Sequence, residues 1–101
     1  MYFIEQGRVC AQLERGGSPP IRLRSSTAGT IVGEIGIYAG GRRTATVVAE
    51  EDCVAVRIAV GAIARMERSE PALTALLQRF LTIMLAEKLS DTNRMLERAL
   101  D

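Results

Sequence analysis

The sequence of 101 residues has no histidine and no tryptophan, and Lys88 is its only lysine. Histidine is the commonest general base near neutral pH, a frequent metal ligand, and the usual activator of serine and cysteine nucleophiles. Its absence argues against a metalloenzyme and against a hydrolase that uses such a nucleophile. Chemistry through carboxylates or the one lysine stays open. We therefore expect no catalytic residue, no metal site and no enzyme activity.

The sequence also lacks a Cys-x-x-Cys motif, a large net charge and a long apolar segment. Cys10 and Cys53 are not part of a Cys-x-x-Cys motif, and they fit two reduced thiols of a cytoplasmic protein. A formal net charge of +1 offers no general attraction for nucleic acid or a membrane surface. No apolar run approaches the roughly 18 residues that cross a bilayer, and the first residues lack the features of a signal peptide. These absences predict a cytoplasmic chain without nucleic acid or direct membrane contact.

The residues that are present suit one globular domain, with 48% hydrophobic and 25% charged residues. Short β-type segments fill the first half of the chain. The expected strands are Tyr2–Glu5, Arg8–Leu13, Ile21–Ser25, Thr30–Val32, Thr44–Ala49 and Cys53–Ile58. The Gln6-Gly7 pair predicts a hairpin between the first two strands, and the composition of Glu14–Pro20 predicts a loop.

The apolar spacing becomes helical at Val60. A short helix is expected over Val60–Glu67 and a long one over Pro71–Leu100, because Ser69-Glu70-Pro71 is a typical helix start. Two apolar stripes follow the long helix: Leu73, Leu77, Phe80 and Met84, then Leu85, Leu89, Thr92, Leu96 and Leu100. The pattern predicts a mainly β fold with C-terminal α, an antiparallel β roll over 1–58 and a helical segment over 59–101 of a single domain.

The segment Val32–Val48, V-G-E-I-G-I-Y-A-G-G-R-R-T-A-T-V-V, combines parts that suit the capture of a small phosphorylated ligand. Gly33 lets a backbone approach a ligand closely, and the Glu34 carboxylate accepts hydrogen bonds from a sugar hydroxyl. One helical turn over Ile35–Tyr38 would offer free N–H groups to an anion. The guanidinium of Arg43 matches the oxygens of a phosphate.

The end of this segment adds further donors. Thr44 supplies a hydroxyl beside Arg43, and Ala45 supplies a small backbone donor. An ordinary hairpin is the alternative interpretation, with Glu34 in a salt bridge and Arg42-Arg43 as a solvated tip. A lone Gly-Glu or Arg-Arg pair would favour that alternative. The complete ordered set between two strands favours ligand capture.

The same segment resembles the phosphate-binding cassette of cyclic nucleotide-binding domains, the β-roll (jelly-roll) modules of catabolite activator proteins, cyclic nucleotide-dependent kinases and cyclic nucleotide-gated channels. V-G-E-I-G-I, Y-A-G-G and R-R-T-A-T-V stand where the family has roughly F-G-E-[LI]-[AG]-L, a short variable stretch and [PR]-R-[AT]-A-[TS]-V. The resemblance implies that Glu34 binds the ribose 2′-hydroxyl and that Arg43 pairs with the cyclic phosphate of cAMP or cGMP. The implied contacts in the cassette are Val32, Gly33, Glu34, Ile35, Gly36, Arg43, Thr44 and Ala45.

The resemblance extends over nearly the whole chain. The segment Tyr2–Gly7 is similar to the Y-x-I-x-x-G strand and turn of the roll, and the terminal helix is similar to the helix that covers the base and makes dimers. Thr92-Asn93 falls where transcription-factor members contact the base, and it equally fits a polar break in an apolar stripe. The resemblance implies a regulatory module of signal transduction that needs no cofactor. Its ligand would move the C-terminal helix, and its partner would be a second copy or a neighbouring effector domain.

Four features depart from the family pattern. Val32 replaces phenylalanine, Arg42 replaces the commoner proline, and Thr44 stands where many cAMP-selective members have alanine, which leaves cAMP and cGMP both open. The first strands of a complete roll do not precede Tyr2, which predicts a truncated chain whose open sheet edges a neighbouring domain or a second copy would cover. The cassette and the helical segment Ala86–Asn93 are also similar to domains appended to bacterial sulfate-permease-type transporters.

Two other functions follow from the same residues. A degenerate roll could serve as a protein-interaction or dimerisation domain without nucleotide, since the leucines at 85, 89, 96 and 100 form a stripe. A small β-roll isomerase of the cupin type is the enzymatic alternative. The missing histidines argue against this alternative, because cupins generally bind their metal through a histidine cluster.

Overall fold

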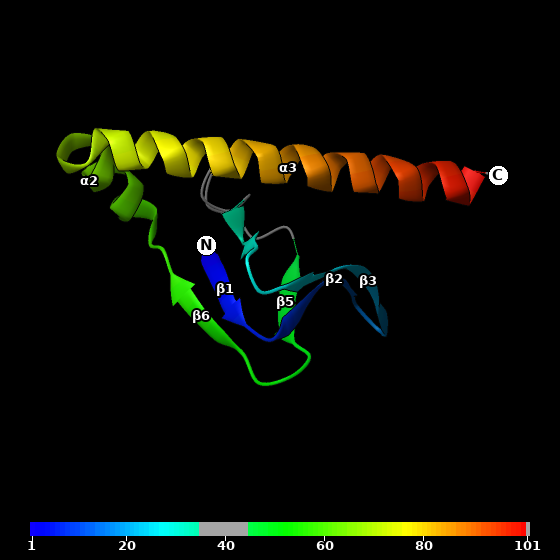
Figure 1. Ribbon diagram of the computed structural model, residues 1–101. Helices are drawn as coiled ribbons and strands as arrows, with labels where there is room; N and C mark the ends of the chain where they lie inside the picture. Colours follow the sequence, from blue (N-terminus) through cyan, green and yellow to red (C-terminus); the bar gives the residue numbers. More distant parts are fainter. Residues whose placement is uncertain (35–44, 101) are drawn as a thin grey trace. The chain divides into compact units, whose positions relative to one another are not determined.

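The computed structural model describes residues 1–34 and 45–100, and this part of the chain contains strands followed by helices (Figure 1). The elements are β1 (Tyr2–Gln6), β2 (Arg8–Arg15), β3 (Ser18–Thr27), β4 (Ile31–Val32), β5 (Thr46–Ala49), β6 (Val54–Arg57), α2 (Val60–Ser69) and α3 (Pro71–Leu100). Every strand pair is antiparallel. The predicted fold class, an antiparallel β roll followed by a short and a long helix, is confirmed. The chain forms two compact units, Met1–Ile63 and Ala64–Asp101.

The first unit consists of two three-stranded sheets, with the orders β4-β1-β6 and β3-β2-β5. The chain passes from one sheet into the other three times, between β1 and β2, between β3 and β4, and between β5 and β6. β1 is the central strand of the first sheet and β2 that of the second. The strands β3 and β4 lie on one side of these central strands, and β5 and β6 lie on the other. Figure 1 shows β1 beside β6, and β2 beside both β3 and β5.

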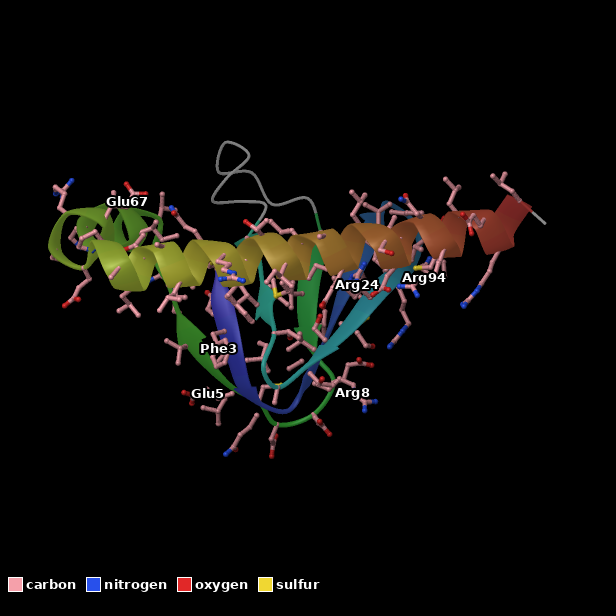
Figure 2. The ribbon with its side chains drawn as sticks, turned by 45° about the horizontal axis from the view of Figure 1, so that its top comes forward. Phe3, Glu5, Arg8, Arg24, Glu67 and Arg94 are labelled. Carbon is pink, nitrogen blue, oxygen red and sulfur yellow. The ribbon has the colours of Figure 1, made fainter. Side chains whose placement is uncertain are left out.

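The turn after β1 is a corner, so the hairpin predicted at Gln6-Gly7 is wrong. β1 hydrogen-bonds to β4 and β6, whereas β2 hydrogen-bonds to β3 and β5. Gly7 has a φ of +94°, a left-handed conformation that lets the chain leave one sheet and enter the other. Figure 2 shows Phe3 and Glu5 on β1, before this corner, and Arg8 at the start of β2. Alternating apolar residues predict strands on both sides of a turn, but they do not reveal which strands pair.

The hairpin of this unit joins β2 to β3. Its loop is Gly16-Gly17 alone, so the loop predicted over Glu14–Pro20 is too long. Pro19 and Pro20 belong to β3, whose only partner among the described strands is β2. An edge strand tolerates proline where the missing N–H faces away from the partner strand, which holds for one of these two successive residues. The Pro19 carbonyl accepts hydrogen bonds from Arg15 Nε and Nη2 at 3.1 and 2.9 Å.

The core of the first unit gathers around the middle of the central strand pair. Ile4, Val9 and Val32 form a buried cluster, and the half-buried Tyr2 and Cys53 pack against it. Ile4 is only 2% exposed and belongs to β1, while Val32 ends β4. The core therefore fixes the strand that leads directly into the predicted ligand cassette.

The second unit contains the end of α2 and all of α3. The predicted helices are confirmed, and α2 continues to Ser69, two residues beyond its expected end. Gln78 Nε2 donates a hydrogen bond to Glu67 Oε1 at 3.2 Å, which ties the two helices together near their junction. In the described part of the chain no helix is both long and apolar enough to cross a membrane.

Candidate functional site

The candidate site begins at the end of β4. Val32 pairs with Tyr2 and Ile31 with Phe3, so β4 lies against the central strand of its sheet. Gly33 follows with a φ of +77°, and Glu34 is only 4% exposed. A carboxylate so far removed from water is favourable only with polar partners, and no buried side-chain nitrogen or oxygen in the described residues lacks one. The Gly-Glu pair thus places a shielded acceptor at the end of a strand.

Backbone hydrogen bonds hold the turn that precedes this strand. Gly29 N donates to Ile4 O, and Ile4 N donates to Thr30 O, each at 2.9 Å. The Thr30 hydroxyl donates to Thr27 O at 2.6 Å, within the same turn. These contacts were not predicted from the sequence. Two threonines flanking an Ala-Gly turn were a signal for the contact between Thr30 and Thr27, but not for the two bonds to Ile4.

The far end of the cassette lies in the other sheet. Ala45 is half-buried and directly precedes β5. β5 pairs with β2 from Thr46 opposite Gln12 to Ala49 opposite Val9. The structure therefore positions Val32, Gly33 and Glu34 at one end of the cassette and Ala45 at the other. Four other predicted ligand contacts, Ile35, Gly36, Arg43 and Thr44, lie outside the described residues.

The predicted base-contacting pair belongs to the second unit. Thr92 and Asn93 are exposed residues of α3. The Thr92 hydroxyl donates to Lys88 O at 3.0 Å, which satisfies the donor along the helix. Their contact with a nucleotide base stays a prediction.

A charged network lies on the sheet that contains β5. Arg22 on β3 donates from Nη1 to Glu50 Oε2 at 2.9 Å and from Nη2 to Ser25 Oγ at 3.1 Å. Ser25 Oγ donates in turn to Glu50 Oε1 at 3.0 Å. The hydrogen bonds from Arg22 and then from Ser25 lower the pKa of Glu50, and the bond to Glu50 raises the pKa of Arg22. The network joins β3 to the end of β5 across β2, and no local sequence pattern predicts a pair 28 residues apart.

The described residues offer little for other chemistry. They contain no group of three or more histidine, cysteine, aspartate or glutamate side chains that could hold a metal ion. The two thiols are free, with Cys10 buried and Cys53 half-buried. Cys53 Sγ donates to Arg8 O at 3.3 Å and to Glu51 O at 3.2 Å, so this thiol serves the corner between β5 and β6.

Comparison with protein families and curated proteins gives one clear match. A family model for the cyclic nucleotide-binding domain matches residues 1–70, which include all six described strands and the whole sequence of the cassette, Val32–Val48. Among curated proteins, none matches the chain significantly.

Solved structures are similar over most of the chain. The c-di-GMP-responsive global regulator CLP of Xanthomonas campestris has a TM-score of 0.86 at 20% identity, over 96% of this chain and 48% of its own. A cyclic nucleotide-binding domain from Methylobacillus flagellatus has the same TM-score and identity, over 96% of this chain and 55% of its own. The regulatory domain of Toxoplasma gondii PKA, solved with cAMP, has a TM-score of 0.60 at 27% identity, over 80% and 30%. The chain thus spans about half the length of each of the first two structures.

Proposed function

The chain belongs to the family of cyclic nucleotide-binding domains, and from this premise we propose that it is a regulatory module that binds cAMP or cGMP. The proposal rests on the burial of Glu34. Its acidic side chain is 4% exposed, two residues after the end of β4 and within the region that matches the family. An acidic residue shielded from water is suited to a hydrogen-bonding partner with a fixed geometry, such as a sugar hydroxyl.

In this proposal the first end of the cassette binds the sugar of the ligand, and the second end binds its phosphate. Glu34 accepts hydrogen bonds from the ribose 2′-hydroxyl, and the backbone of Gly33 allows the sugar to approach closely. Arg43 pairs with the cyclic phosphate, with Thr44 and Ala45 completing the set of donors. Val32, Ile35 and Gly36 line the same segment and add apolar or backbone contacts. The ligand is held without covalent chemistry, so the module needs no cofactor and catalyses no reaction.

The choice between cAMP and cGMP rests on Thr44. A hydroxyl at this position gives the guanine nucleotide an additional partner, whereas the similar PKA domain is one that was solved with cAMP. We therefore propose that both nucleotides bind and that removal of the Thr44 hydroxyl shifts the preference toward cAMP.

The output of the module is a movement of α3. Thr92 and Asn93 contact the base, and the exposed residues Leu89, Leu96 and Leu100 of the same helix face a second copy or an effector domain. The module and its effector belong to one larger signalling or transport protein. A bacterial sulfate-permease-type transporter with this module appended is one such protein. The module then works in the cytoplasm.

Isothermal titration of cAMP and of cGMP into the purified chain tests the proposal. We expect binding with a Kd of about 10 µM or tighter, and its loss in Arg43→Ala, because a charge-assisted contact to phosphate contributes about 2 kcal/mol or more. Arg15→Ala is the matched control, since Arg15 contacts only the local Pro19 carbonyl in the hydrogen bonds described above. Folded protein that releases no heat with either nucleotide would overturn the proposal.

A second candidate function is an interaction domain without nucleotide. Large apolar side chains are exposed on both outer strands of one side of the roll, with Val47 and Val48 on β5 and Val54 and Val56 on β6 at 40 to 47% exposure. Such residues favour contact with another polypeptide. Arg43→Ala separates the two candidates, because it would leave the oligomeric state unchanged if the chain were only an interaction domain.

A further inference from the structure

The turn between β3 and β4 is closed by a side chain outside the cassette. The Thr30 hydroxyl donates to Thr27 O at 2.6 Å, a short O–H···O hydrogen bond. Gly29 stands inside this turn with a φ of +90°, and its Cβ position would meet no other atom within 4 Å. The turn needs glycine at this position because of its positive φ, not for lack of space. The hydrogen bond of the threonine hydroxyl then stabilises this turn conformation.

This turn is attached to the centre of the roll at one residue. Ile4 accepts a hydrogen bond from Gly29 N and donates one to Thr30 O, so both of its backbone groups bind the turn. Its side chain is 2% exposed and lies in the core cluster with Val32. One residue of the central strand therefore holds the turn through its backbone and the following strand through its side chain.

The strand that follows is short and is held by its neighbours. β4 has two residues, both buried, and in the described part of the chain Val32 pairs with Tyr2 and Ile31 with Phe3. Three residues separate Thr30 from Glu34, and the last of them is Gly33 with a φ of +77°. Because Ile4 binds the turn through its backbone and packs against Val32 in the core, a shift of the turn acts on the end of β4, from which Gly33 and Glu34 follow.

We propose that Thr30 is a positioning residue, which holds Glu34 in place for the ribose 2′-hydroxyl and thereby sets the preference for ribo- over 2′-deoxyribo-nucleotides. The inference rests on the proposed function, because it needs a cyclic nucleotide in the cassette. Thr30 acts through the turn and the short strand, and it makes no contact with the ligand itself. Its loss should therefore affect the contact at the 2′ position and leave the contact at the phosphate unchanged.

The test compares cAMP with 2′-deoxy-cAMP by isothermal titration, in the wild-type chain, Thr30→Val and Thr30→Ser. The wild type should prefer cAMP by about tenfold, the effect of one hydrogen bond to a carboxylate. Thr30→Val keeps the size and branching of the side chain but lacks the donor, and it should reduce this preference to about twofold or less. Thr30→Ser restores the donor and should restore the preference. Ser69→Ala is the matched control, since it also removes a hydroxyl that donates to a backbone carbonyl, Arg65 O at 3.0 Å.

Each outcome has one meaning. A Thr30→Val variant that binds both nucleotides more weakly by the same factor would show a merely structural role and overturn the inference, as would an unchanged preference. If Thr30→Val does not fold, the same ratio is measured on Thr30→Ala. If the wild type binds neither nucleotide, the proposed function fails first, and the inference fails with it. If the wild type binds both nucleotides equally, the inference is overturned together with the role of Glu34 at the 2′-hydroxyl, while nucleotide binding itself stands.

Discussion

A Cβ atom placed on Gly7 would lie 2.6 Å from Cys53 Sγ and 2.5 Å from the carbonyl oxygen of Asp52. Two corners of the roll therefore stack with no space for a side chain between them. The corner from β1 to β2 supplies the glycine, and the corner from β5 to β6 supplies the thiol. The thiol also donates to the carbonyls of Arg8 and Glu51, which fastens the two corners together.

Gly7→Ala should destabilise the roll. The substitution combines a φ of +94° with a contact to backbone atoms that cannot move aside, and we expect a loss of roughly 2 kcal/mol or more in the free energy of unfolding. Gly16→Ala is the control, because its Cβ would meet nothing within 4 Å. Urea unfolding of the two variants measures the difference, and equal stabilities would contradict the steric account.

Ile4→Ala should strongly destabilise the first unit. The side chain is 2% exposed, and its removal leaves a cavity between Val9 and Val32, so a loss of about 3 kcal/mol is expected. Leu23→Ala removes a similar number of atoms from a side chain that is 40% exposed and should cost far less. Thermal unfolding followed by circular dichroism compares the two, and a similar shift in Tm for both would place the core elsewhere.

The network of Arg22, Ser25 and Glu50 predicts a pH dependence with a definite sign. Because its partners lower the pKa of Glu50 below the ordinary value of 4.5, the folded state favours the carboxylate. The stabilisation is then complete above about pH 4.5 and is lost as the pH falls through the lowered pKa. Glu50→Gln should destabilise slightly at pH 7, and this effect should shrink as the pH falls below about 4.5.

Denaturation of wild type and Glu50→Gln at a series of pH values measures this difference. The neighbouring exposed carboxylate of Glu51 gives the control variant Glu51→Gln. A difference between Glu50→Gln and wild type that stays constant down to pH 3 would show that charge does not contribute to the network.

Glu34→Gln should weaken nucleotide binding under the proposed function. The amide keeps the size of the side chain but loses the charge that strengthens a hydrogen bond, so we expect about tenfold weaker binding of cAMP. The loss should be much smaller for 2′-deoxy-cAMP, which has no hydroxyl at that position. Glu14→Gln, at an exposed residue of β2, is the control. Equal losses for both nucleotides would assign Glu34 to another part of the ligand.

The sequence predicted the elements better than their connections. The β-type residues over Cys53–Ile58 and the helical spacing after Val60 depend on local chemistry. The strand was found over Val54–Arg57, one residue shorter at each end, and the helix begins at Val60 as expected. The prediction of a hairpin at Gln6-Gly7 was wrong because a glycine with a positive φ occurs in hairpins and in corners alike. Only the strands with which β1 and β2 pair distinguish the two structures.

The candidate site divides in the same way. The pair Gly33-Glu34 was singled out from the complete ordered set over Val32–Val48 and its resemblance to the family, whereas the burial of Glu34 is known only from the structure. The support from Ile4 was missed, since it consists of backbone hydrogen bonds between residues more than 20 positions apart. Such bonds leave no compositional pattern in the sequence.

The two sides of the roll differ in how they meet another sheet edge. On one side β3 contains Pro19 and Pro20, and successive residues of a strand direct their N–H groups to alternate sides, so one of the two prolines removes an outward donor. On the other side β5 is Thr-Val-Val-Ala and β6 is Val-Ala-Val-Arg, without proline. Among the described strands, β5 and β6 therefore offer more backbone groups to a second sheet than the edge of β3 does. Association of two copies through strand edges would be easier on the side of β5 and β6 than at β3, which disfavours growth in both directions.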